Sequence, residues 1–291
     1  MLLRYAKILF SMLKNLRRFL DSQESLMLLA LNRQIISSVY APPPPLISKS
    51  PALSHKIIVS LTTYKNRIHY VHYALDSLYH QTLRPSEVRL YVAKGEYKTL
   101  PAILEKFKPW LQVIEVRDIG SYKKFIPALK SVKENELIVS LDDDFLYPPH
   151  LIASLYELFL KYPHALIGYC GFKNGKPYFE SIAGGFGILW NPEIFHPNKM
   201  AFFFDEKLFF DSIGRNLDDA WIALSCLERG IEMVCCSDDY VGAFREFVEL
   251  PSGAISPISR AGEGSCNYIS KEEKARLKHK MLEMIRENLG K

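Results

Sequence analysis

Short apolar runs alternate with helical patterns along the chain between Lys56 and Leu141. The β-rich runs occupy residues 56–62, 88–93, 111–116 and 136–141. Amphipathic helical patterns fill the intervals, at 69–81, 100–107 and 125–132. Strands that alternate with helices form parallel sheets, because each helix returns the chain to the same edge of the sheet. The sequence therefore predicts an α/β fold with a mostly parallel sheet flanked by helices.

The second half of the chain is less regular. Helices are predicted at 149–162 and 217–230, and strands, some with glycine bends, at 164–172, 175–191 and 231–236. The aromatic residues Trp190 and 202–204 are expected in the core rather than stacked on a sugar.

Composition divides the chain into four segments. Residues 1–40 form a basic amphipathic helical arm, and residues 41–51 a stiff proline-rich linker. Residues 52–270 form the α/β domain, and residues 271–291 a basic C-terminal helix. The two reasonable roles for the arm are binding in the plane of an anionic membrane surface through residues 1–20, and packing on the domain or on a second subunit in a homo-oligomer.

Charge and cysteine content restrict the function further. The formal net charge is +5, and residues 1–20 alone hold five basic residues and no acidic one, so the remainder is neutral. A nucleic-acid partner is not expected, because such proteins spread cationic residues over a binding face. The five cysteines form no CxxC pair, and no apolar run is long enough to span a membrane. We expect a cytoplasmic protein, without a signal peptide, on the inner face of the membrane.

Three consecutive aspartates, Asp142, Asp143 and Asp144, follow the run at 136–141. Carboxylate oxygens are the ligands that Mg²⁺ and Mn²⁺ prefer. In open α/β sheets, ligands bind at the carboxyl ends of the strands, where residues 61–67 are also expected. The alternative is a solvated acidic turn that caps the next helix. The position after a buried strand favours a metal site.

Several segments resemble, in chain order, those of bacterial GT-A glycosyltransferases of the family-2 type, which include lipopolysaccharide and capsule sugar transferases. These segments are "IIVSLTTYKNR", "ALDSLYHQTLRPSEVRLYV", "VSLDDDFLYPPHLI", "AGGFGILWNPEIF" and "LDDAWIALSCLERGI". The resemblance covers about residues 55–245 and includes an "SLxxQTxxP" pattern from Ser77 to Pro85. It implies that residues 52–270 are a GT-A catalytic domain.

The resemblance also implies a nucleotide-sugar donor, linked to UDP or GDP, and Mn²⁺ or Mg²⁺ as cofactor. The metal ligands would be Asp144 and Asp142. The donor-binding residues would be Thr62, Tyr64, Arg67, Lys123, Lys124, Asp142, Asp143 and Arg260. For Lys123 and Lys124 an exposed basic turn is the alternative to a phosphate site, and for Arg260 it is a surface charge.

Asp219, with Asp218 as second choice, resembles the acidic pair that supplies the catalytic base of inverting transferases. The competing explanation is N-capping by Asp218, with Asp219 favoured by the helix dipole. The expected reaction is transfer of a hexose or deoxyhexose to a glycan that is lipid-linked or part of lipopolysaccharide or capsule.

Two other classes of protein remain open. A sugar-nucleotide pyrophosphorylase shares the α/β plan but needs a glycine-rich, arginine-bearing loop where this chain reads "SLTTYKNR". A non-catalytic, membrane-associated scaffold with a degenerate fold would bind neither metal nor nucleotide.

The arm generates a direct test. If residues 1–20 bind anionic membranes, the full chain sediments with anionic vesicles and a chain that begins at Lys49 does not. Equal sedimentation of both chains would refute membrane binding by the arm.

Overall fold

The structure is a computed structural model that describes residues 54–173, 175–176, 178–215, 217–250 and 270–291. The predicted arm, the proline-rich linker and Arg260 lie outside these residues. None of the helices within the described ranges combines the length and the apolar character that crossing a membrane requires.

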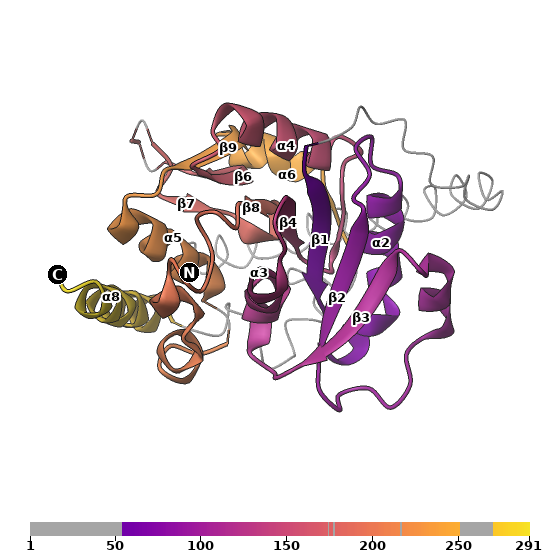
Figure 1. The fold of residues 1–291 in the computed structure, drawn as a ribbon, viewed down its shortest axis with the longest axis horizontal. Helices are drawn as coiled ribbons and strands as arrows, with labels where there is room; N and C mark the ends of the chain where they lie inside the picture. The colour runs from indigo at the N-terminus through magenta and orange to yellow at the C-terminus, as the bar shows by residue number, and fades with distance from the viewer. Residues whose placement is uncertain (1–53, 174, 177, 216, 251–269) are drawn as a thin grey trace, which may run out of the picture.

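A mixed sheet forms the centre of the molecule, with strand order β3-β2-β1-β4-β8-β6-β7 and β9 beside β6 (Figure 1). Its strands are β1 (Lys56–Thr62), β2 (Glu87–Ala93), β3 (Leu111–Val116), β4 (Glu136–Leu141), β6 (Leu166–Phe172), β7 (Ser181–Ile182), β8 (Ile188–Trp190) and β9 (Met233–Ser237). The pairs β3–β2, β2–β1, β1–β4 and β6–β9 are parallel, whereas β8 runs antiparallel to both β4 and β6. The predicted α/β fold with a mostly parallel sheet is confirmed.

Helices cover both faces of this sheet. The α-helices are α2 (Val71–Tyr79), α3 (Ile126–Ser131), α4 (Leu151–Lys161), α5 (Asp218–Arg229), α6 (Tyr240–Arg245) and α8 (Lys271–Asn288). Short 3₁₀ or π turns are η1 (Lys65–His69), η2 (Ala102–Phe107), η3 (Gly120–Lys124), η4 (Gly184–Phe186), η5 (Ala201–Phe204) and η6 (Lys207–Asp211). A small ribbon pairs β5 (Phe145–Leu146) with β10 (Val248–Glu249).

The helix predicted at 100–107 is instead the 3₁₀ turn η2. Pro101 precedes this turn and Pro109 follows it closely, so the segment is too short for a stable α-helix.

The core forms two apolar layers, one on each face of the sheet. Successive residues of β1 point to opposite faces of the sheet. Val59 therefore packs in the layer of α2 and α4, and Ile58 in the layer of α3 and α5. Trp190 is fully buried, stacks on Phe125 with ring centroids 5.0 Å apart, and donates a 2.8 Å hydrogen bond to Ser140. The core position predicted for Trp190 and residues 202–204 is confirmed.

The carboxyl ends of β1 and β4 lie side by side, with Leu61 paired to Leu141. The segments that follow these strands, residues 62–67 and 142–144, therefore start at the same edge of the sheet. This confirms the prediction that they face one crevice.

Candidate active site

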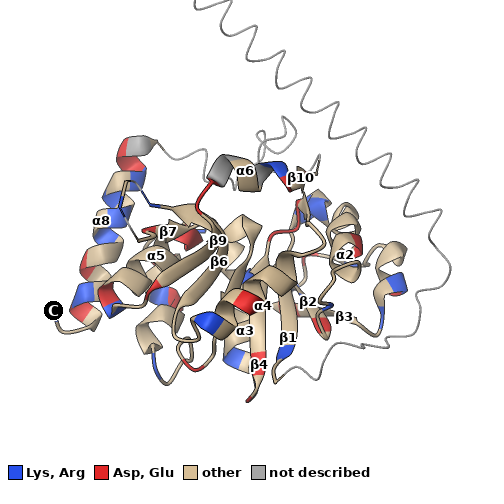
Figure 2. Ribbon diagram, turned by 90° about the horizontal axis from the view of Figure 1, so that it is seen from above, with Lys and Arg blue, Asp and Glu red and all other residues tan. Residues whose placement is uncertain are grey.

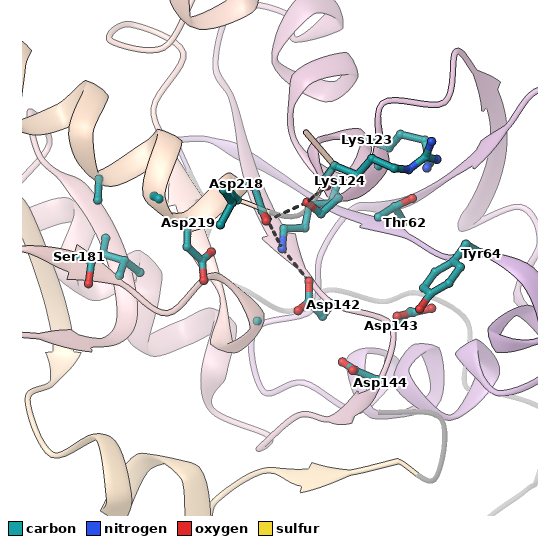
Figure 3. Close-up of a pocket in the computed structure, with 18 of the residues that line it drawn as sticks. Thr62, Tyr64, Lys123, Lys124, Asp142, Asp143, Asp144, Ser181, Asp218 and Asp219 are labelled. Carbon is teal, nitrogen blue, oxygen red and sulfur yellow. Dashed lines mark hydrogen bonds and ion pairs between the residues drawn. The ribbon is translucent and has the colours of Figure 1, made fainter. Parts of the chain in front are cut away.

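A pocket of about 1100 Å³ lies at this edge of the sheet (Figure 3). Its wall includes the end of β1, the aspartate turn after β4, η3, Gly185 of η4 and the start of α5. Thr62, Tyr64, Arg67, Lys123, Lys124, Asp142, Asp143, Asp144, Asp218 and Asp219 all line it. The structure thus brings together every predicted site residue that it describes.

The aspartate turn is held by Arg67. One guanidinium nitrogen lies 2.5 Å from Asp143 Oδ1 and 2.6 Å from Asp144 Oδ2. Burial acts to lower the pKa of Arg67, but the charges of these carboxylates outweigh burial and raise that pKa above its ordinary value. Burial and the like charges of Asp142 and Asp143 raise the pKa of Asp144 to about 7, even beside Arg67.

Lys124 joins the two acidic parts of the pocket. Its Nζ lies 2.7 Å from Asp142 Oδ1 and 2.9 Å from Asp218 Oδ2 (Figure 3), and the residue is only 4% exposed. Burial acts to raise the pKa of Asp142, but the charge and hydrogen bond of Lys124 outweigh it and lower that pKa. The lysine is therefore a fixed counterion between β4 and α5.

Lys123 forms a separate ion pair at the pocket edge, with its Nζ 2.6 Å from Asp118 Oδ1. Arg215 pairs with the second oxygen of Asp118. Partial burial acts to raise the pKa of Asp118. The two cations and the Gly120 N–H outweigh this effect and lower that pKa to about 2. Because Lys123 and Lys124 are both buried, the alternative of an exposed basic turn is wrong.

Asp218 and Asp219 begin α5, but neither caps it. The N-cap residue is Leu217, and no side chain accepts a capping hydrogen bond, so the N-capping explanation for Asp218 is wrong. Asp219 is a partly accessible residue that lines the pocket. Desolvation by the surrounding walls and the charge of Asp218 raise the pKa of Asp219 to about 7. A carboxylate with this pKa can exchange a proton near neutral pH.

Two glycines allow the backbone to pass between these carboxylates. A Cβ atom on Gly185 would lie 2.8 Å from Asp142 Oδ2, and one on Gly184 would come closer still to Asp219 Oδ1. Real Cβ atoms do not approach oxygens so closely, so only glycine leaves both carboxylates in their places.

The "SLxxQTxxP" pattern supports the aspartate turn from behind. Ser77 Oγ accepts a 3.0 Å hydrogen bond from the Tyr147 N–H, and Gln81 donates a 2.8 Å hydrogen bond to the Pro148 carbonyl. The Tyr147 hydroxyl in turn donates a 2.7 Å hydrogen bond to the backbone carbonyl of Asp142. These residues therefore position the turn without lining the pocket.

The donor set fits a hard divalent cation. Asp144 Oδ1 is buried and makes no hydrogen bond in the described structure, which leaves one carboxylate oxygen available. Among the described residues, however, no group of three or more His, Cys, Asp or Glu side chains forms a ready metal site. Mg²⁺ is commonly held by one or two carboxylates and substrate phosphates, and Asp142 and Asp144 are suited to that arrangement.

Some pocket residues were not identified from the sequence. Ser121, whose hydroxyl donates a 2.8 Å hydrogen bond to Asp218, belongs to this group, as do Asp118 and Arg215. Lys274 and Lys278 of α8 also line the pocket. No local pattern distinguishes these residues from surface charges, because only the tertiary fold brings them to the pocket.

No protein-family model matches this chain, and no curated protein matches it. Solved structures with partial similarity include the mannosyltransferase PcManGT from Pyrobaculum calidifontis in complex with GDP-Man and Mn²⁺. It is 16% identical, with a TM-score of 0.49 over 65% of this chain, which spans only 56% of that protein's length.

Two further structures show weaker similarity. The 4-diphosphocytidyl-2C-methyl-D-erythritol synthase from Anaerococcus prevotii is 12% identical, with a TM-score of 0.46 over 64% of this chain and 88% of its own. TarS from S. aureus is 24% identical, with a TM-score of 0.34 over 42% of this chain and 37% of its own. At TM-scores below 0.5, the function of this chain has to be inferred from its own pocket.

The bridging position of Lys124 leads to a prediction about stability. Lys124→Met leaves the buried Asp218 and the half-buried Asp142 without their cation, and should lower the free energy of unfolding by about 3–5 kcal/mol. Lys123→Met is the matched control, because its partner Asp118 is 38% exposed at the side chain and keeps Arg215. Chemical denaturation without divalent cations measures both. Equal losses in the two variants would show that the bridge has no special role.

Proposed function

We propose that this chain is a metal-dependent glycosyltransferase that uses a nucleotide-sugar donor. The observation that carries the proposal is one pocket with two chemically different acidic centres, the aspartate turn at one side and Asp219 at the other. The turn and the nearby cations suit a diphosphate with its metal, whereas the raised pKa of Asp219 suits a proton acceptor.

In this proposal Asp142 and Asp144 would hold Mn²⁺ or Mg²⁺, and the bound metal would supply positive charge for the nucleoside diphosphate leaving group. Tyr64 and Arg67 line the same side of the pocket, with the guanidinium 5.3 Å from the centre of the Tyr64 ring. An aromatic ring there is suited to stacking against the nucleobase. Lys123 lines the pocket beside its partner Asp118, and in this proposal it meets phosphate oxygens.

The transfer step is a single displacement. The acceptor hydroxyl oxygen attacks the anomeric carbon while the bond from that carbon to the diphosphate oxygen breaks. Asp219 takes the proton of the hydroxyl, and the sugar is transferred with inversion. Asp218 is held by Lys124 and Ser121, so it lies too firmly in its ion pair to be the first choice as base.

Metal and nucleotide should bind together. Each carboxylate of the turn already faces a cation of the chain, so Mn²⁺ alone should stabilise the protein little. Mn²⁺ with the correct nucleotide, at a hundredfold excess over its dissociation constant, should add about 2.7 kcal/mol to the free energy of unfolding. A thermal-shift panel of UDP, GDP and CMP, each with and without Mn²⁺, measures this and identifies the donor base.

Two variants serve this panel. Asp144→Asn should remove the metal-dependent stabilisation, whereas Glu96→Gln, the same chemical change at the pocket rim, should keep it. If no nucleotide stabilises the protein with metal, the transferase proposal is wrong.

The assignment of Asp219 predicts a pH profile. Its base form is the deprotonated one, so the rate should rise with pH through about 7, the pKa of Asp219. Asp219→Asn should lower turnover by about 10²-fold or more while nucleotide binding stays unchanged. Release of nucleoside diphosphate by slow donor hydrolysis, with water as acceptor, gives the rate. If Asp218→Asn stops turnover and Asp219→Asn does not, Asp218 is the base.

A further inference from the structure

The pocket continues beyond Asp219, away from the aspartate turn. There it is lined by Ser181 of β7, by Ala223, Leu224 and Leu227 of α5, and by Lys274 and Lys278 of α8. We call these six residues the acceptor end. Figure 3 shows Asp219 between Ser181 on this side and Asp142 on the other. A molecule bound at the acceptor end would thus present its atoms to Asp219 from the side opposite the donor.

Lys274 and Lys278 are available to a ligand. They are four residues apart on α8, so they lie on the same face of the helix. Neither makes an ion pair or a side-chain hydrogen bond with any residue in the described part of the chain. Basic and acidic residues recur along α8 (Figure 2). The other basic side chains described on this helix each have a partner. Arg276 pairs with Glu273, His279 with Glu283 and Arg286 with Glu228, and Lys280 binds the Ser212 carbonyl.

The position of these two lysines is fixed by the packing of α8. Met281 and Ile285 of this helix are fully buried in the core. Arg286 holds the helix to α5 through hydrogen bonds of 3.0 and 2.9 Å to Glu228. At its other end, Ser270 caps the helix by accepting a 3.1 Å hydrogen bond from the Glu273 N–H. The packing of α8 thereby keeps Lys274 and Lys278 at the pocket wall.

The acceptor end differs in chemistry from the donor side. On the donor side, Arg67, Lys123 and Lys124 are each already paired with an aspartate. At the acceptor end, two lysines that form no ion pair with any described residue lie beside an apolar wall whose Leu227 is 44% exposed. Two neighbouring ammonium groups suit a ligand group with several charged oxygens, and a phosphate has these.

We infer that the acceptor carries a phosphate group, which Lys274 and Lys278 bind while the hydroxyl to be glycosylated lies at Asp219. This rests on the proposed transferase function and adds the substrate class. The phosphate belongs either to a soluble phosphorylated sugar or to the headgroup of a lipid carrier, and both present the same chemistry to the two lysines.

The test measures binding of two phosphate probes and one neutral probe to the full chain by calorimetry. The probes are glucose 6-phosphate, for the soluble source, geranyl diphosphate, for the lipid source, and glucose. Nucleoside diphosphate and Mn²⁺ are present throughout, so that the donor side is filled. At least one phosphate probe should bind about tenfold or more tightly than glucose. The probe that does so identifies the source.

The variant Lys274→Gln/Lys278→Gln should weaken that binding by about tenfold or more. The control Arg276→Gln/Lys280→Gln removes the same charge from the same helix, and should leave binding unchanged. Three results would overturn the inference: glucose binding as tightly as the phosphate probes, unchanged affinity in the Lys274/Lys278 variant, or an equal loss in the control.

The experiment also separates the inference from the proposed function. The Lys274/Lys278 variant should keep the nucleotide and Mn²⁺ thermal shift of the unmodified chain, because both lysines lie away from the aspartate turn. Absence of that thermal shift in the unmodified chain would contradict the transferase function. Phosphate binding by the two lysines would still be tested, because the Lys274/Lys278 variant is compared with the Arg276/Lys280 control.

Discussion

Three adjacent carboxylates at the end of a buried strand repel one another, and the structure depends on the cations that balance them. Arg67 pairs with two of them, and Lys124 pairs with the third. Lys124 also binds Asp218, so the same ammonium group that stabilises the aspartate turn fixes the start of α5. The relative position of the two acidic centres therefore depends on one buried side chain. A neutral residue there would leave Asp142 and Asp218 without their cation in a region of low dielectric constant.

The proposed division of labour within the pocket follows from this arrangement. Burial, neighbouring carboxylates and cations act differently on each acid, lowering the pKa of Asp142 and raising those of Asp144 and Asp219. Residues of the same type thus acquire different chemistry from their surroundings. The backbone of Gly184 and Gly185 passes between these acids without displacing either.

The fold and the acidic centres were accessible from the sequence because local patterns determine them. Strand and helix periodicity predicted the sheet, and the position of residues 142–144 after a buried strand predicted their place at its edge. The pairings were not accessible, since Arg67 and the aspartate turn are far apart in the chain and only the register of β1 with β4 brings them together. Lys274 and Lys278 look like ordinary surface lysines, and the "SLxxQTxxP" pattern supports the turn through hydrogen bonds between segments far apart in the chain.

Because the cations that balance the aspartate turn are side chains of the protein, folding of the turn does not require a bound metal ion. A site whose carboxylates depended on a metal for neutrality would fold only when the metal is present. Here Arg67 and Lys124 already neutralise carboxylates of the turn, so the turn does not depend on a metal for its counterions. Under the proposed function, a cell could then hold an inactive reserve of enzyme and start glycan synthesis as soon as the cation returns, without new translation.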